Sequence, residues 1–127
     1  MQNAKMYCLC LHNKVLPIMK KLDYIPVGLG NENFSSEWLK DNTLDNISFK
    51  NKYYGEYTFH YWFWKNVLPK IEDNYWVGFC AYREYWGNQK KITPDSHVKD
   101  VVIHEIPPEW ENFDTIIGDE RYINNLK

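Results

Sequence analysis

The chain has 127 residues, of which 44% are hydrophobic, 25% are charged and 17% are aromatic, and its formal net charge is −2. This length predicts one domain over residues 1–127, and the scattered lysines and arginines exclude the basic face that nucleic-acid binding requires. No stretch approaches the roughly 18–20 apolar residues of a membrane span, and no apolar signal core follows the N-terminus.

The first part of the chain predicts two short strands. Met6–Leu11 is a continuous apolar run, which is typical of a strand buried on both faces. A second strand is predicted over Tyr24–Leu29. The segment Phe34–Lys40 is compatible with a helical turn capped by one of the serines at 35 and 36, and Asn42–Lys52 is polar and predicted to be a loop.

A strongly aromatic helix is predicted over Tyr54–Leu68, and Pro69 is expected to end it. One stripe of the helix has large side chains at intervals of four, three and four residues, which are Tyr57, Tyr61, Trp64 and Leu68. We expect this stripe to face the core. Trp62 and Phe63 lie off the stripe, so the helix is expected to be buried on more than one face.

The remainder of the chain predicts a third strand over Tyr75–Tyr82 and two more over Val98–Ile103 and Thr115–Ile117. Pro107-Pro108 marks an extended break between the last two. Strands separated by helices predict an α/β domain with a partly parallel sheet. We find no internal repeat and no linker that would divide the chain.

The three cysteines, Cys8, Cys10 and Cys80, all lie in predicted strands. Their number is odd and they form no Cys-x-x-Cys pair, so we expect buried, reduced thiols rather than a disulfide framework. Reduced thiols favour a cytoplasmic location. A zinc site is not expected, because Cys8 and Cys10 have no second pair of ligands nearby.

Polar clusters follow three of the predicted strands. They are His12-Asn13-Lys14, Gly28-Leu29-Gly30-Asn31 and Tyr82-Arg83-Glu84. In open α/β sheets ligands bind beyond the carboxyl ends of the strands, so these clusters are expected to converge. Each has a structural alternative: His12 can bond a backbone carbonyl, the two glycines lack a dinucleotide fingerprint and suit a turn, and Arg83 can pair with Glu84 instead of a phosphate.

Residues 45–86 interleave aromatic rings with amides, carboxylates and a few cations. A core alone does not need so many polar groups among its rings, whereas a site that stacks on flat ligands and bonds their hydroxyls does. This pattern favours sugars or nucleotides as ligands. Glu56 and His60 also have a purely structural interpretation, because they are spaced i, i+4 and Glu56 lies in the first turn of the predicted helix, where the helix dipole favours a carboxylate.

The motifs of this region resemble a bacterial family, domain of unknown function 4422, whose members occur in capsular polysaccharide, exopolysaccharide and lipopolysaccharide gene clusters and are described as glycosyltransferases. The matching motifs are Asp45-Asn46-Ile47-Ser48, Lys50-Asn51, Tyr53-Tyr54-x-Glu56-x-Thr58, Tyr61-Trp62-x-Trp64-Lys65-Asn66 and Gly78-Phe79-Cys80-x-Tyr82-Arg83. The resemblance implies transfer of a sugar from a nucleotide-sugar donor to a glycan acceptor. It also implies a GT-A-like, Rossmann-related fold.

The resemblance suggests roles for these residues. Many GT-A enzymes hold a divalent cation, Mn²⁺ or Mg²⁺, with an Asp-x-Asp motif, which this sequence lacks. Arg83 would instead neutralise the donor diphosphate, with help from Lys50 or Lys65. Glu56 would be the general base, with Asp45 as second candidate. The remaining ligand contacts would come from His12, Asp45, Asn46 and Asn51, with a stacking platform of Tyr82, Tyr85 and Trp86.

Two departures from the family pattern leave alternatives open. The last motif usually reads His-Tyr-Arg-Arg, whereas this chain has Ala81-Tyr82-Arg83-Glu84. Family members are also generally longer, so the chain would be a minimal version of the fold or its N-terminal part. The alternative functions are a non-catalytic glycan- or nucleotide-binding module and a structural domain of a larger synthesis protein. In each case the protein is expected to be cytoplasmic, with or without peripheral association with the inner membrane.

Overall fold

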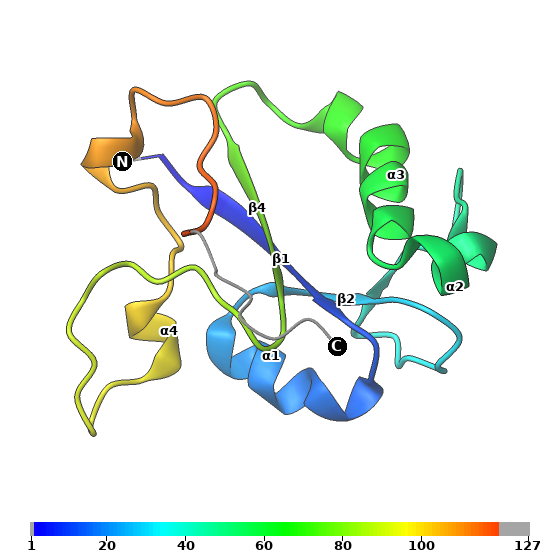
Figure 1. Ribbon diagram of the computed structural model, residues 1–127, viewed down its shortest axis with the longest axis horizontal. Helices are drawn as coiled ribbons and strands as arrows, with labels where there is room; N and C mark the ends of the chain where they lie inside the picture. The colour runs from blue at the N-terminus through cyan, green and yellow to red at the C-terminus, as the bar shows by residue number, and fades with distance from the viewer. Residues whose placement is uncertain (1, 120–127) are drawn as a thin grey trace, which may run out of the picture.

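The computed structural model describes residues 2–119 and shows an α/β domain built on a four-stranded sheet (Figure 1). The strands lie in the order β3-β2-β1-β4, and each neighbouring pair is parallel, which is compatible with a Rossmann-like arrangement. Their bounds are Ala4–Cys10 for β1, Ile25–Gly28 for β2, Leu39–Lys40 for β3 and Trp76–Ala81 for β4.

Helices connect the strands. The α-helices are α1 (Leu16–Leu22), α2 (Asn51–Tyr54), α3 (Tyr57–Asn66) and α4 (Val98–Val101), and the 3-10 helices are η1 (Asn13–Val15), η2 (Ser48–Lys50), η3 (Leu68–Lys70) and η4 (Pro108–Trp110). Helix α1 and the segment around α4 lie on one face of the sheet, and α3 covers the other (Figure 1). The predicted α/β class, the three main strands and the central helix are therefore confirmed.

Strand β1 is central because both of its faces are apolar. Its even-numbered side chains, including Cys8 and Cys10, pack with Met19 of α1. Its odd-numbered side chains, Tyr7 and Leu9, pack against α3. The continuous apolar run in the sequence thus reflects burial on both sides of one strand.

The predicted helix over Tyr54–Leu68 is divided into α2 and α3 at Gly55. Gly55 has φ 55° and ψ −132°, a backbone conformation that side chains with a Cβ atom rarely adopt. Helix α3 then ends at Asn66, before Pro69, which lies in η3. The glycine at position 55 therefore sets the direction in which α3 leaves α2.

The predicted core stripe of this helix is wrong. Tyr57 is 70% exposed and Trp64 is 55% exposed, whereas Phe59 on the opposite face is fully buried. Trp62 and Phe63 share that buried face with Phe59. Both faces of α3 carry aromatic rings, so periodicity alone could not show which face the sheet covers.

Three other predicted elements differ from the structure. Residues 98–101 form the helix α4 rather than the start of a strand, although Val102 makes an isolated antiparallel bridge with Gly87. Thr115–Ile117 has no regular secondary structure. Phe34–Lys40 is a turn, closed by the Trp38 N–H donating to the Ser35 carbonyl, and it ends in β3, because pairing with β2 holds residues 39 and 40 extended.

The cysteine predictions agree with the structure. Cys8 and Cys10 are buried, Cys80 is half-buried, and all three are free thiols. A side-chain hydrogen bond with Cys10, another with Cys80 and burial all raise the pKa of the Cys8 thiol. All three thiols pack in the layer between the sheet and α1.

Candidate functional site

The carboxyl ends of β1, β2 and β4 lie at one edge of the sheet, because the strands are parallel neighbours in register. Cys10 is paired with Gly28 across β1 and β2, and Leu9 with Ala81 across β1 and β4. The three polar clusters predicted to follow these strands therefore begin at the same edge. We refer to it as the carboxyl edge.

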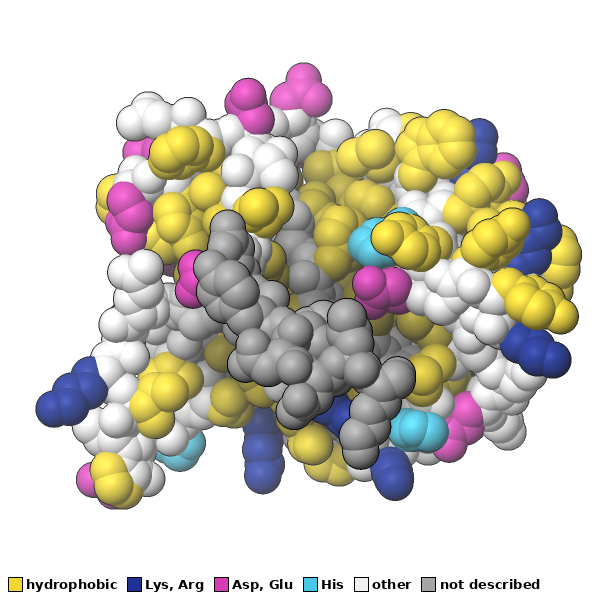
Figure 2. All heavy atoms as spheres, viewed as in Figure 1, with side chains coloured by type: hydrophobic (Ala, Val, Ile, Leu, Met, Phe, Trp, Pro, Cys, Tyr) yellow, Lys and Arg dark blue, Asp and Glu magenta, His cyan; other side chains and the backbone are white. Residues whose placement is uncertain are grey.

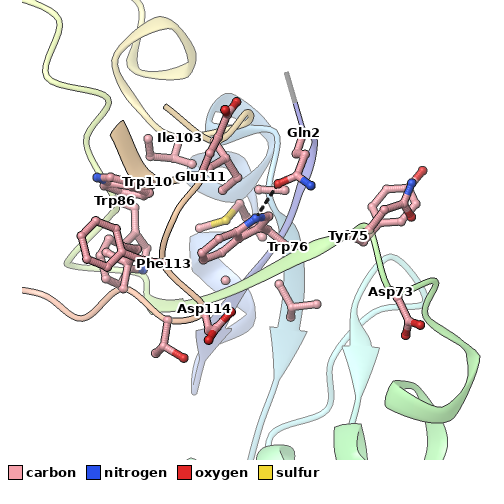
Figure 3. A pocket seen from close by; sticks show the side chains of 18 residues that line it. Gln2, Asp73, Tyr75, Trp76, Trp86, Ile103, Trp110, Glu111, Phe113 and Asp114 are labelled. Carbon is pink, nitrogen blue, oxygen red and sulfur yellow. Dashed lines mark hydrogen bonds between the residues drawn. The ribbon is translucent and has the colours of Figure 1, made fainter. Parts of the chain in front are cut away.

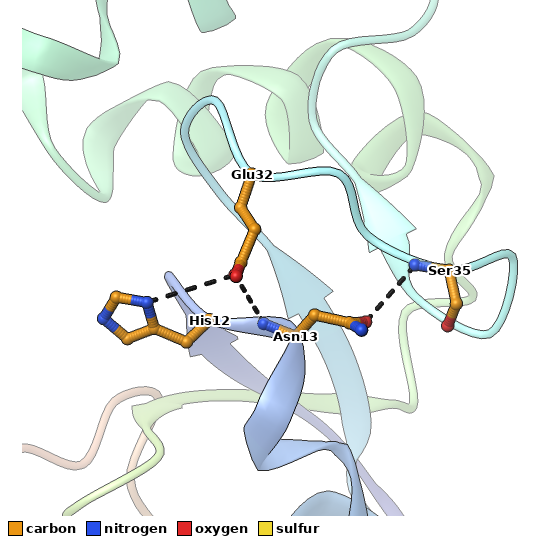
Figure 4. Close-up of polar contacts among 4 residues, drawn as sticks. All are labelled: His12, Asn13, Glu32 and Ser35. Atoms are coloured by element: carbon orange, nitrogen blue, oxygen red, sulfur yellow. Dashed lines mark hydrogen bonds and ion pairs between the residues drawn. The ribbon is translucent and has the colours of Figure 1, made fainter.

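A hydrogen-bonded group joins the loops that follow β1 and β2 (Figure 4). The Glu32 carboxylate accepts the backbone N–H of Asn13 and lies 4.0 Å from Nδ1 of His12. The Asn13 side-chain oxygen accepts the backbone N–H of Ser35 at 3.3 Å. The side chains of His12 and Glu32 are 52% and 41% exposed, so a ligand could reach both. A histidine beside a carboxylate can bind hydroxyl groups or exchange a proton with one.

A buried polar network joins the residue that follows β3 to helices α2 and α3. Asp41, directly after β3, is 2% exposed and accepts a 2.6 Å hydrogen bond from the Thr58 hydroxyl in the first turn of α3. The Asn51 amide donates to the Thr58 hydroxyl at 3.2 Å and to the Gly55 carbonyl at 2.9 Å. Burial raises the pKa of the Asp41 carboxyl, and the hydrogen bond from Thr58 opposes this shift.

The network adjoins the loop after β2 at Gly30. This glycine has φ +80°, and a Cβ atom added there would lie 3.4 Å from Oδ1 of Asn51. The loop backbone therefore passes close to the amide that reaches Thr58. Of the predicted site residues, Asn51 and His12 are thus both placed at the carboxyl edge.

Asp45 and Asn46 have structural contacts. The Tyr61 hydroxyl donates to the Asp45 carboxylate at 2.9 Å, and this bond is the main reason why the pKa of Tyr61 is raised. The Asn66 amide donates to the Asp45 carbonyl at 2.8 Å, whereas the Asn46 side chain closes a local turn by accepting the Ser48 N–H. These bonds fasten the loop after β3 to α3.

Glu56 immediately precedes α3, and its side chain is exposed. Within residues 2–119 no hydrogen bond or ion pair joins the side chains of Glu56 and His60; the His60 backbone N–H donates to the Glu56 carbonyl at 3.3 Å, and the His60 ring packs edge-on against Phe79 at 4.8 Å. Lys50 and Lys65 lie over aromatic rings, with the Lys65 ammonium 3.8 Å from the Trp64 ring centroid. Lys65 therefore belongs to the outer face of α3.

Four predicted ligand-binding residues follow β4, and the structure places them apart from one another. They are Tyr82, Arg83, Tyr85 and Trp86. Arg83 Nε donates to the Tyr82 hydroxyl at 2.9 Å, and the guanidinium lies 5.2 Å from the centre of that ring, so Arg83 stays near the carboxyl edge. The Tyr85 hydroxyl donates to the Tyr82 carbonyl. The chain then turns back, and Trp86 donates its indole N–H to the Phe79 carbonyl in the middle of β4. The predicted stacking platform of Tyr82, Tyr85 and Trp86 is thus spread along β4.

A cavity of about 470 Å³ lies at the opposite end of the sheet, beside the first residues of β1 and β4 (Figure 3). Its walls are aromatic, and include Trp86 and Trp110, whose rings meet edge to face at 6.2 Å. Its polar lining includes Gln2, Asp73, Glu111 and Asp114. No local sequence pattern predicts this cavity, because its residues come from four separated segments.

Four of the residues given roles in the predicted site, His12, Asp45, Glu56 and Arg83, line neither this cavity nor the smaller one beside α1. His12 and Arg83 follow neighbouring strands, whereas Asp45 and Glu56 are placed by α3. Glu32, Asp41 and Thr58 were not assigned roles from the sequence. Thr58 lies within one of the motifs that resemble the family, but a lone glutamate in a polar loop and a lone aspartate after a two-residue strand have no distinguishing pattern.

Over residues 2–119, no three or more His, Cys, Asp or Glu side chains are grouped so that they could hold a metal ion. In the same part of the chain, no helix has the length and apolar character needed to cross a membrane.

The sequence profile of a family described as "Domain of unknown function (DUF4422)" matches residues 5–127. No curated protein and no solved structure matches the chain.

Proposed function

We propose that this chain, which belongs to the DUF4422 family, is a glycosyltransferase that moves a sugar from a nucleotide-sugar donor to a growing bacterial surface polysaccharide. The family membership itself assigns no activity. The proposal is supported by the carboxyl edge, where polar side chains from two strand ends and from α2 surround the Gly30 loop. This is the position at which open α/β sheets bind nucleotides. The GT-A variant of the fold is part of the proposal.

The donor diphosphate would bind near Arg83. Sugar transfer leaves negative charge on the departing diphosphate, and a planar guanidinium can stabilise it with two parallel hydrogen bonds. The bond from Arg83 Nε to the Tyr82 hydroxyl orients the guanidinium at the end of β4. The sugar hydroxyls would bond to Asn51 and to the His12–Glu32 pair.

The acceptor hydroxyl must lose a proton as it attacks the donor sugar. Glu56 remains the proposed base, since its carboxylate is exposed immediately before α3 and close in sequence to Asn51. Asp45 is less suited, because its carboxylate accepts the Tyr61 hydroxyl. Glu56→Gln should abolish transfer and leave nucleotide binding unchanged. If Glu56→Gln instead keeps full activity and Asp45→Asn abolishes transfer without changing nucleotide binding, Asp45 is the base.

Calorimetry with UDP, GDP, CDP and dTDP, each with and without EDTA, tests the proposal. At least one nucleoside diphosphate should bind, and Arg83→Lys should weaken it at least several-fold without changing the melting temperature, because an ammonium cannot reproduce the planar fork. Glu84→Gln is the matched control and should retain the affinity. Affinity that is unchanged in Arg83→Lys, or that disappears with EDTA, would contradict the role given to Arg83.

The cavity at the other end of the sheet favours a second candidate function, a glycan-binding module without turnover. Aromatic walls with carboxylates and an amide are suited to sugar rings, whose flat faces stack and whose hydroxyls donate. For such a module, the wild type should bind oligosaccharides on a glycan array and should bind no nucleotide. Trp110→Ala should abolish the oligosaccharide binding. Nucleotide binding that depends on Arg83 would favour the transferase instead.

A further inference from the structure

The outer side of α2 and α3 exposes an unusual number of aromatic side chains. Six of the twelve large hydrophobic side chains that are exposed in residues 2–119 come from residues 49–68, and they are Phe49, Tyr53, Tyr54, Tyr57, Trp64 and Leu68. Figure 2 shows hydrophobic and basic side chains gathered at the right of the view, over α2 and α3. With Lys50, Lys52 and Lys65, these six side chains form what we call the aromatic–lysine face.

The three lysines are part of this face rather than of a separate rim. The Lys65 ammonium lies 3.8 Å from the Trp64 ring centroid, and the Lys50 ammonium lies 5.7 Å from that of Tyr54. Lys52 lies 5.6 Å from the Tyr53 ring centroid. The same stretch contains one carboxylate, Glu56, although the whole chain has a net charge of −2. Positive charge is therefore concentrated where the aromatic rings are exposed.

The chemistry of this face identifies what would cover it. Tyrosine and tryptophan prefer the interface between lipid hydrocarbon and water, and lysine is attracted to anionic head groups. Aromatic rings are also enriched in protein–protein interfaces, but lysine is depleted there, and the three lysines that lie against these rings therefore disfavour a protein partner. A small ligand is also disfavoured, because none of these nine side chains lines either of the two cavities described above.

We propose that the aromatic–lysine face docks on the surface of an anionic phospholipid bilayer, with the outer side of α3 against the head groups. The opposite side of α3 stays packed on the sheet through Phe59 and Phe63. Because Thr58 in the first turn of α3 bonds to Asp41, docking would bring the carboxyl edge close to the membrane surface. This inference does not depend on the proposed transferase activity.

Vesicle co-sedimentation of the full chain tests the proposal. Vesicles of phosphatidylcholine and phosphatidylglycerol in equal parts should bind the protein, vesicles of phosphatidylcholine alone should bind it much less, and added salt should weaken the binding. Each lysine near an anionic surface contributes roughly a fivefold gain in partitioning, so Lys50→Gln with Lys65→Gln should reduce it about 30-fold. Trp64→Ala should also weaken binding by removing an interfacial ring.

Matched controls separate this face from general charge and hydrophobicity. Lys90→Gln with Lys91→Gln makes the same charge change in an exposed loop, and Phe113→Ala removes an exposed ring elsewhere. Both should bind like the wild type, and all variants should keep the wild-type melting temperature. Binding that ignores lipid charge, an equal loss in the controls, or no binding to anionic vesicles would overturn the proposal. So would a solution dimer that Trp64→Ala dissociates, because the face would then be covered by a second copy.

Discussion

Two alanine substitutions on α3 provide a direct measure of which face of this helix supports the fold. Phe59 is fully buried between α3 and the sheet, and its ring lies within about 6 Å of those of Tyr7, Trp62, Phe63 and Phe79. Tyr57 is two residues earlier, about 200° around the helix, and 70% exposed. The two residues have similar helix propensity, so the matched pair isolates burial.

Phe59→Ala should lower the free energy of unfolding by about 3–5 kcal/mol, because it removes a buried ring and leaves a cavity among the surrounding aromatic side chains. Tyr57→Ala should change it by less than about 0.5 kcal/mol. A domain of this size has about 5–15 kcal/mol in total, so the first loss is a large fraction of the stability and the second is negligible.

Urea denaturation followed by circular dichroism provides the measurement, and the midpoint of Phe59→Ala should fall while that of Tyr57→Ala stays near the wild type. If Phe59→Ala does not fold, the smaller truncation Phe63→Leu should still lower the midpoint. A loss in Tyr57→Ala equal to that in Phe59→Ala would refute the argument, because it would mean that the stripe predicted from the sequence is the buried one.

Three further predictions concern single interactions. Burial raises the pKa of Asp41 above its ordinary value of 3.8, so the folded state binds this proton more tightly than the unfolded state does. The contribution of Asp41 to stability therefore falls as the pH rises through the folded pKa, and Asp41→Asn should remove this dependence. In urea titrations the wild type should gain stability relative to the variant as the pH is lowered toward 3.8. Gly55→Ala should cost about 1–3 kcal/mol in the same assay, since the backbone there is strained for alanine, and an unchanged midpoint would show that the break between α2 and α3 can relax. Tyr24→Phe should cost about 1 kcal/mol by thermal or urea unfolding, because the Tyr24 hydroxyl donates a buried 2.8 Å hydrogen bond to the Ile103 carbonyl; no loss would mean that water replaces the hydroxyl.

The parts of the fold that the sequence predicted are those with a strong local pattern. Met6–Leu11 and Tyr75–Tyr82 are runs of apolar and aromatic residues, and both form strands within two residues of the predicted bounds. Strand β3 could not be predicted, because two residues are too few to show an alternating pattern and their extended conformation depends on pairing with β2. The sequence over Val98–Ile103 has the β-branched composition of a strand, yet its first four residues form a helix.

The sequence predicts that the candidate site lies at the strand ends, but it does not predict which side chains bond to one another there. His12 was identified because it follows a buried strand, but its neighbour Glu32 is twenty residues away in a polar loop. Asp41 and Thr58 are seventeen residues apart, and their bond requires α3 to return to the sheet at one particular angle. That angle follows from the glycine backbone at Gly55, which no side-chain pattern encodes.

Helix α3 links these observations, because its two aromatic faces have different surroundings. The inner face has phenylalanine and the Trp62 indole, whose N–H donates to the Thr43 carbonyl, so this polar atom has a partner and the rings can be buried. The outer face has tyrosine hydroxyls and lysine ammonium groups, which lose hydration when they are covered by hydrocarbon but keep it among head groups. A lipid surface would therefore cover the outer rings without burying their polar ends, whereas the apolar core of a protein interface would bury both. The chemistry that distinguishes the two faces is thus the same chemistry that assigns the sheet to one and a membrane surface to the other.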